Sequence, residues 1–174
     1  EDTSVDEYGA GFKNLPGLWK DEFVERHQEL TDRIHTYGSK IAVQLYHAGR
    51  ESDSSIKGVR PVAPSAIQDP TKPETPHELT VDEIKALEEE FAQAARRAKD
   101  AGYDAVELHG AHGYLFNQFV SPFSNKRTDE YGGNLHNRLR FPLEIIARIQ
   151  ELNGDDFPII YLISADEMVP GGLT

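Results

Sequence analysis

The feature that most restricts the fold of this chain is a regular alternation of short apolar runs with longer amphipathic segments. The apolar runs lie at residues 40–46, 103–108 and 157–163. The last of them, FPIIYLI, is hydrophobic at nearly every position, which is typical of a parallel strand covered on both faces. Each run follows a segment whose apolar residues recur at helical spacing. The order helix, strand, three times over, predicts an α/β protein with a parallel sheet and crossover helices.

The segments between the runs carry signals for helix ends. Thr80 and Glu83 have the spacing of a capping box, so a helix is expected to begin there. Pro142 lies inside another helical pattern and is expected to kink it. We expect helices at 21–37, 80–101 and 134–152, and loops at 1–19, 51–79 and 118–133, with VAPSAI at 62–67 packed against the body of the protein.

Two architectures fit this alternation. A doubly wound nucleotide-binding fold needs a G-x-G-x-x-G turn, but the turn after residues 103–108 offers only Gly110 and Gly113. A TIM (β/α)8 barrel instead gathers its functional residues at the ends of successive strands, and Gln44, His109 and Ser164 stand there. Three strands cannot close a barrel of eight. We therefore predict that residues 1–174 form a single, incomplete (β/α)8 barrel domain with about three strands, an internal part of a larger barrel.

Composition limits the partners of the chain. It has 30 acidic and 18 basic residues, for a net charge of −12, which repels nucleic acid and anionic lipid surfaces. It has no cysteine, so it offers no disulfide, thiolate metal site or iron–sulfur ligand. It has no apolar run long enough to span a membrane, and it shows no secretion signal. We expect a cytoplasmic protein that acts on a small molecule.

Two histidines and a tyrosine, His109, His112 and Tyr114, follow the second apolar run directly. From the residues alone, they could be ordinary polar groups of a loop, metal ligands, proton carriers or hydrogen-bond donors. A zinc site needs a third ligand that the neighbouring sequence does not provide, so we predict no metal. Two imidazole N–H groups would stabilise negative charge that develops on a carbonyl oxygen. A phenol, which stays protonated at neutral pH, can deliver its proton to a carbanionic carbon.

Gln44, near the end of the first apolar run, is the other marked polar residue. Its amide has both a donor and an acceptor, as is needed to bind the imide edge of an isoalloxazine ring. From the residue alone, a buried glutamine that bonds to backbone is the more common explanation of such a position.

The stretch that holds these residues resembles a known family. Residues 107–141, which read ELHGAHGYLFNQFVSPFSNKRTDEYGGNLHNRLRF, are similar to the signature of the old yellow enzyme family of FMN-dependent ene-reductases and NAD(P)H:flavin oxidoreductases. Further similarity lies in QLYHAGR at 44–50, VAPSAI at 62–67 and SADEMVPGGLT at 164–174. The resemblance implies the (β/α)8 barrel, FMN and NAD(P)H as cofactors, and leaves room for a homo-oligomer.

The resemblance also implies roles for single residues. His109 and His112 match the pair that binds the activating carbonyl of the substrate, Tyr114 matches the proton donor, and Gln44 matches the glutamine that contacts the flavin. The implied reaction passes a hydride from NAD(P)H through flavin to an activated, α,β-unsaturated alkene or a related acceptor. The protein would orient the reactants and shape their electrostatics, while the cofactor does the redox chemistry.

One position departs from the family pattern. Where the family has an arginine beside the flavin's pyrimidine edge, two residues before Ser164, this chain has Leu162. Leucine cannot supply that positive charge. An alternative therefore stands beside the enzyme: a non-catalytic barrel fragment, or an impaired family member without flavin.

Overall fold

The core of the protein is a parallel sheet of four strands. The computed structural model describes residues 2–174. The sheet consists of β1 (Asp2–Ser4), β2 (Ala42–Tyr46), β5 (Ala105–Gly110) and β6 (Ile159–Ile163), in the spatial order β1-β2-β5-β6. Every neighbouring pair is parallel, so the predicted α/β class with crossover helices is confirmed. All three predicted strands are present as β2, β5 and β6, and the described sheet has a fourth strand, β1, that the sequence did not predict.

The strand missed by the sequence is β1, which lies within a segment expected to be a loop. Its three residues read Asp-Thr-Ser, without the β-branched or aromatic run that marks a strand. Pairing decides its structure instead, since Asp2 lies opposite Gln44 and Ser4 lies opposite Tyr46 in the neighbouring strand. Thr3 and Ser4 are buried although they are polar. Tertiary context thus overrides a weak local preference.

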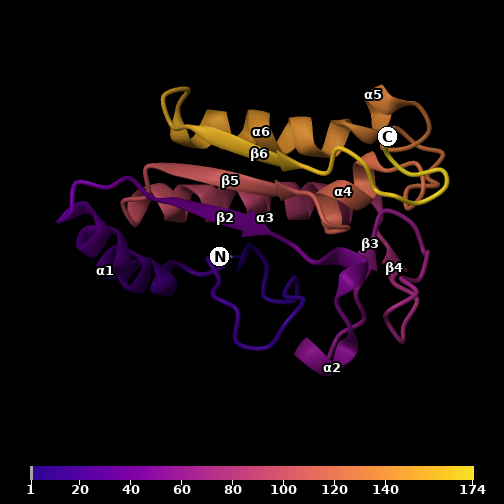
Figure 1. Cartoon of the computed structure of the whole chain (residues 1–174), viewed down its shortest axis with the longest axis horizontal. Coiled ribbons are helices and arrows are strands. Elements are labelled where there is room, and N and C mark those ends of the chain that lie inside the picture. Colours follow the sequence, from indigo (N-terminus) through magenta and orange to yellow (C-terminus); the bar gives the residue numbers. More distant parts are fainter. Residues whose placement is uncertain (1) are drawn as a thin grey trace.

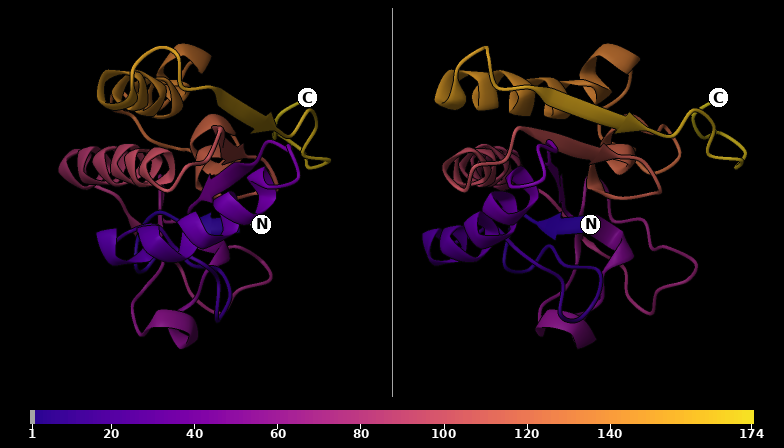
Figure 2. Two further views of the ribbon diagram at one scale, coloured as in Figure 1. Left: turned by 90° about the vertical axis from the view of Figure 1, so that its left-hand side faces the viewer. Right: turned by 60° about the vertical axis from the view of Figure 1, so that its left-hand side comes forward.

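Three helices cover one face of the sheet, as Figures 1 and 2 show. They are α1 (Val24–His35), which a 3-10 turn at Asp21–Phe23 precedes, α3 (Val81–Asp100) and α6 (Arg140–Asn153). The apolar stripe of α3 packs on the sheet residues Leu45 and Leu108, and its buried side chains include Ile84, Leu87, Phe91, Ala95 and Ala98. Thr80 and Glu83 form the predicted capping box at its start.

The third helical segment is interrupted, but not where a kink was expected. It divides into α5 (Leu135–Arg138) and α6, with the break at Leu139. Pro142 lies in the first turn of α6, where backbone N–H groups have no partner within the helix, so its missing N–H costs nothing there. The expectation that Pro142 kinks the helix is therefore wrong.

The long connections fold into short elements at one end of the sheet. Residues 51–79 contain α2 (Ser54–Lys57) and a parallel pair of two-residue strands, β3 (Val62–Ala63) and β4 (His77–Glu78), and a 3-10 turn (Gly49–Glu51) precedes them. Ala63 and Ser65 are buried, which confirms that the segment 62–67 packs. The loop expected from residue 118 begins later, because α4 (Leu115–Val120) is a fully buried helix.

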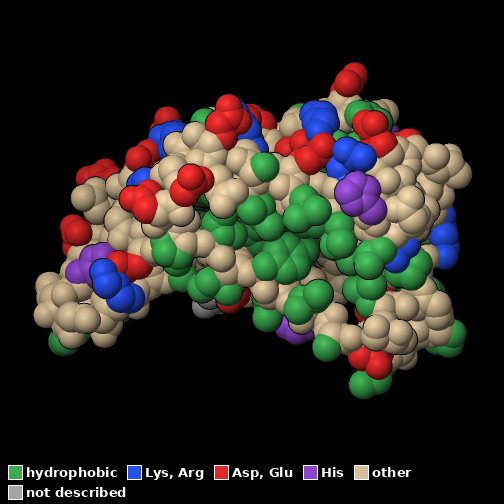
Figure 3. Space-filling model, turned by 90° about the horizontal axis from the view of Figure 1, so that it is seen from above, with side chains coloured by type: hydrophobic (Ala, Val, Ile, Leu, Met, Phe, Trp, Pro, Cys, Tyr) green, Lys and Arg blue, Asp and Glu red, His purple; other side chains and the backbone are tan. Residues whose placement is uncertain are grey.

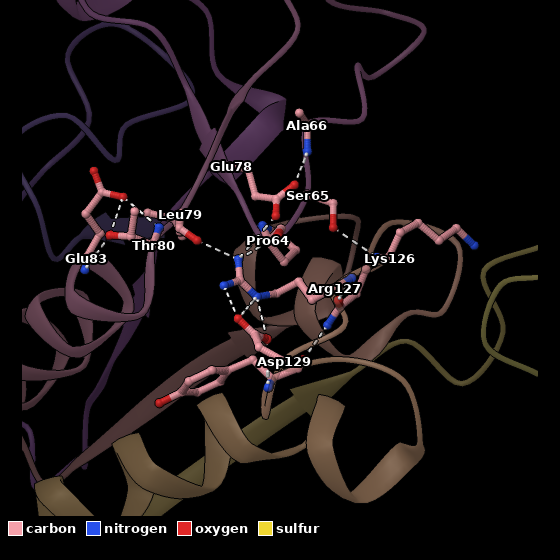
Figure 4. Close-up of polar contacts among 12 residues, drawn as sticks. Pro64, Ser65, Ala66, Glu78, Leu79, Thr80, Glu83, Lys126, Arg127 and Asp129 are labelled. Atoms are coloured by element: carbon pink, nitrogen blue, oxygen red, sulfur yellow. Dashed lines mark hydrogen bonds and ion pairs between the residues drawn. The ribbon is translucent and has the colours of Figure 1, made fainter.

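A buried arginine ties these connections together, as Figure 4 shows. Arg127 donates to the backbone oxygens of Pro64, at 2.9 Å, and Leu79, at 2.5 Å, and forms an ion pair with Asp129. The backbone N–H of Lys126 donates to Ser65 Oγ at 2.9 Å. One side chain thus joins the loop 121–134 to the segment 62–67 and to the start of α3.

The sheet has two lateral edges within the described residues, at β1 and β6. Seen from the side on which α6 and β6 lie, the surface shows a continuous hydrophobic area (Figure 3). The exposed apolar side chains Leu143, Ile160 and Ile163 belong to these two elements. In a closed barrel, the free edge of a strand such as β6 would pair with a further strand.

Candidate active site

The face of the sheet opposite the helices carries polar side chains. Side chains alternate between the two faces of a strand, and Leu45 and Leu108 point toward α3. Gln44 and Glu107, which precede them by one residue, therefore point away from the helices. Register places Asp2, Gln44 and Glu107 side by side in one row across three strands. His109 lies two residues beyond Glu107 on the same face.

Four aromatic rings meet where β5 ends. The ring of His109 lies 5.1 Å from that of His112 and 4.8 Å from that of Tyr114, both nearly perpendicular to it. Tyr46, at the end of β2, contacts the Tyr114 ring at 5.0 Å. The structure thus brings together the two histidines and the tyrosine that the sequence singled out. Tyr46 was not predicted, although it stands at a strand end two residues after Gln44.

The hydrogen bonds of His109 indicate which nitrogen carries its proton. Its Nδ1 accepts a hydrogen bond from the backbone N–H of Ala111 at 3.3 Å, which leaves Nε2 as the protonated nitrogen. Burial lowers the pKa of His109, so the imidazole is neutral near pH 7. Nε2 lies 3.8 Å from Asp2 Oδ1, beyond hydrogen-bond distance. His109 therefore offers an N–H donor on this face.

A tight turn carries the chain from His109 to Tyr114. His112 has a φ of 58° and Gly113 a φ of 79°, a left-handed pair that glycine adopts freely and histidine rarely. The backbone N–H of His112 donates to Ser164 Oγ, at the end of β6, at 3.0 Å. This bond holds the turn and leaves the His112 side chain exposed. A non-glycine residue with positive φ is often found at functional sites.

Tyr114 stands at the N-cap of α4, with its ring between those of Tyr46 and His109. Burial raises the pKa of its phenol above the usual value, and the carboxylates of Asp2 and Glu51 raise it further. The hydroxyl therefore keeps its proton at neutral pH. A protonated phenol beside a neutral N–H donor can stabilise an oxygen and protonate a nearby carbon.

Gln44 does not join the ring cluster directly. Its Nε2 donates to Oε1 of Glu107, its neighbour in the row. The amide oxygen of Gln44 remains as an acceptor on this face. Sequence reasoning missed both Glu107 and Asp2. The alternation in Glu107-Leu-His109 could have placed Glu107 on the His109 face, but nothing in the sequence marks Asp2 as part of a strand.

Leu162 faces His109 across the β5–β6 pair. The four strands of the described sheet contain neither lysine nor arginine. The face of the sheet opposite the helices is therefore acidic at the row of Asp2 and Glu107 and apolar at Leu162. No strand residue replaces the cation that the family pattern has at this position.

The side chains on this face fit a flavin in part. The amide oxygen of Gln44 can accept from the imide N–H of an isoalloxazine ring, and the imidazole and phenol groups suit a carbonyl compound beside such a ring. The missing cation at position 162 is the exception. Across residues 2–174, no group of three or more histidine, aspartate and glutamate side chains is arranged to hold a metal ion. No helix in that range has the length and apolar character to cross a bilayer.

Comparison with known proteins agrees with this chemistry. The family described as NADH:flavin oxidoreductase / NADH oxidase matches residues 1–174. The chain is 49% identical over 155 residues to an NADH oxidase of Thermoanaerobacter brockii, covering 88% of this chain and 24% of the relative. It is 46% identical over 176 residues to an NADPH dehydrogenase of Geobacillus sp. (strain WCH70), covering 100% of this chain and 50% of the relative.

Solved structures show the same relationship. Morphinone reductase superposes with a TM-score of 0.87 at 36% identity, over 92% of this chain and 48% of that protein. The old yellow enzyme homologue from Zymomonas mobilis superposes with a TM-score of 0.88 at 36% identity, with the same coverage. The chain thus spans between a quarter and half of the length of these relatives.

The parallel α/β sheet and these superpositions define the class: part of a TIM barrel of the old yellow enzyme type. The chain belongs to the NADH:flavin oxidoreductase / NADH oxidase family. Membership implies FMN and NAD(P)H as the cofactors of this family. The resemblance found in the sequence is therefore confirmed.

Proposed function

We propose that the protein is an FMN-dependent oxidoreductase that reduces an activated, α,β-unsaturated alkene or a related small acceptor at the expense of NAD(P)H. The observation that carries this proposal is the convergence of the His109, His112 and Tyr114 rings at the end of β5. Family membership supports the redox class, and the ring cluster supports the acceptor. Cytoplasmic location remains part of this proposal, on the basis of the composition.

The roles of the side chains follow from their donors and protons. The N–H of His109 Nε2, together with His112, donates to the carbonyl oxygen of the acceptor and stabilises the negative charge that develops there. Tyr114 delivers its proton to the α-carbon. The amide of Gln44 orients the flavin ring. Bound FMN would supply the hydride, taken from NAD(P)H, to the β-carbon.

Replacing Tyr114 by Phe tests the role of the phenol. Tyr114→Phe should reduce alkene turnover by about 100-fold or more, which is the usual contribution of general acid catalysis, while NAD(P)H still reduces the flavin. The exposed Tyr37 provides a matched control, because Tyr37→Phe removes a hydroxyl far from the rings. Equal losses of flavin reduction and alkene reduction in Tyr114→Phe would contradict the assignment.

A second candidate is a non-catalytic member of the family, and Leu162 is the observation that favours it. The two candidates differ in flavin binding. The enzyme should take up added FMN, turn yellow and lose its colour under NAD(P)H without oxygen. A protein that stays colourless at saturating FMN would refute the enzyme and support the non-catalytic member.

A further inference from the structure

A cavity of about 400 Å³ lies apart from the ring cluster, and none of the four proposed site residues lines it. Its volume falls within the range of small-molecule sites in proteins. It lies between the loop after β1, the end of β2, the segment before β3 and the first turns of α3. Its wall is mainly apolar, and the apolar side chains are Val59, Pro61, Val62, Leu79, Ala86 and Leu87.

One buried donor, the imidazole of His47, faces this cavity. Its side chain is only 4% exposed. Nδ1 of His47 accepts a hydrogen bond from the backbone N–H of Gly49 at 3.0 Å, which leaves the proton on Nε2. The nearest carboxylate oxygen, Asp6 Oδ1, lies 3.9 Å from Nε2, too far for a hydrogen bond. Among the described residues, the N–H of His47 Nε2 therefore has no direct hydrogen-bond acceptor and can donate to a molecule in the cavity.

The other charged residues of the lining are already engaged. Arg60 donates to the backbone oxygens of Thr75 and Pro76. Glu83 accepts from the backbone N–H of Thr80 and from His77. The groups that remain for a ligand are the Nε2–H of His47, the hydroxyl of the exposed Tyr8 and the carboxylate of Asp6. Asp6 Oδ1 already accepts a hydrogen bond from the Tyr8 N–H at 2.7 Å and has a further lone pair to offer.

The cavity is held in shape by contacts outside it. Arg127 donates to the backbone oxygen of Leu79, and the capping box fixes Glu83 beside it (Figure 4). On the opposite side, Gly9 lies against the imidazole. A Cβ at Gly9 would come within 2.5 Å of His47 Cδ2, so only glycine leaves room for the ring in this position. A preformed wall loses little conformational entropy when a ligand binds.

We propose that this cavity binds a neutral, largely apolar molecule through one hydroxyl group, which accepts a hydrogen bond from His47 Nε2 and donates one to the carboxylate of Asp6. A hydroxyl is both a donor and an acceptor, so it satisfies both groups across the 3.9 Å gap. A carboxylate ligand would be repelled by the negative charge of Asp6. An ammonium group has only N–H donors, so it could not accept the hydrogen bond from His47 Nε2. The proposal is independent of the reaction at the ring cluster.

The test uses this chain without FMN, labelled with ¹⁵N in its 7 histidines, and three cyclohexyl probes. Cyclohexanol should shift the ring resonances of His47 in a saturable way. Cyclohexyl methyl ether keeps the acceptor but lacks the donor to Asp6, so it should bind at least about 10-fold more weakly than cyclohexanol. Cyclohexanecarboxylate should not shift His47. Equal affinities for the alcohol and the ether, or no saturable shift with the alcohol, would overturn the proposal.

Two variants locate the site. Ala86 is exposed on α3, so Ala86→Leu keeps a good helix former while its side chain fills the cavity, and binding of cyclohexanol should be lost. Ala147→Leu, on the exposed face of α6, is the matched control and should bind as the parent does. Asp6→Asn keeps the shape of the side chain and should weaken binding about 10-fold. Unchanged binding in Ala86→Leu would place the probe elsewhere and refute the site.

Discussion

Replacing the buried Arg127 by Ala should destabilise the protein more than the same replacement of a surface arginine. The side chain is 5% exposed, donates to two backbone oxygens and pairs with Asp129. Breaking a buried ion pair by removing one partner costs about 3–5 kcal/mol. Asp129 is 35% exposed and keeps a hydrogen bond from the Tyr131 N–H, so its carboxylate regains water, which favours the lower end of that range. We expect a loss of about 3 kcal/mol, or about 6–12 °C in Tm for a domain of this size.

Urea denaturation followed by far-ultraviolet circular dichroism measures this loss. Arg26→Ala is the control, because Arg26 is 81% exposed in its pair with Glu29 and such pairs contribute about 1 kcal/mol or less. Asp129→Ala should cost less in the Arg127→Ala background than in the parent, since the charge is already unpaired there. The reasoning would be refuted if Arg127→Ala and Arg26→Ala destabilised the protein equally.

Three further predictions concern a cap, a carboxyl group and the functional face. Thr80→Ala removes one half of the capping box and should lower the free energy of unfolding in urea by about 1 kcal/mol, whereas Thr36→Ala, at the far end of α1, should have less effect. Burial, with Asp69 beside it, raises the pKa of Glu51 to about 7, so the folded state binds more protons than the unfolded state between the two pKa values. Stability should therefore fall as pH rises from about 4.5 through 7, and Glu51→Gln should reduce that fall; identical pH profiles would contradict this. Leu162→Arg adds a cation to the face of the sheet that carries His109 and should tighten FMN binding about 10-fold or more in a fluorescence titration, with Ile163→Arg, on the opposite face of β6, as the control.

Much of the fold could be predicted because several local signals agree. The run 157–163 is apolar throughout, and α3 has both a capping box and a continuous apolar stripe. The failures lie where tertiary contacts decide the outcome. Nothing in Asp2–Ser4 favours a strand until β2 lies beside it, and α4 is short and buried on all sides, so it shows no amphipathic period. The break at Leu139 likewise has no sequence signal as strong as the misleading proline.

The candidate site divides in the same way. His109, His112 and Tyr114 are close in the sequence, so one turn suffices to bring their rings together. Asp2 and Glu107 belong to the site only through strand register, which places residues 105 positions apart in one row. A sequence can show which side chains follow a strand, but register decides which strands are neighbours. The cavity at His47 was missed for the same reason, since its wall combines four separate segments.

Because position 162 is a leucine, no cation of the strands offsets the carboxylates of Asp2 and Glu107, and this affects the proposed function. A face with Asp2 and Glu107 and without a lysine or arginine on its four strands disfavours added negative charge. Reduction adds negative charge to a flavin ring, so this face alone would favour the oxidised ring. The two histidine donors, His109 and His112, therefore bear more of the stabilisation than they would beside a cation. Replacing either histidine should therefore lower alkene turnover by a larger factor in the parent protein than in the Leu162→Arg variant. Measuring alkene turnover with and without the replacement in both proteins tests this.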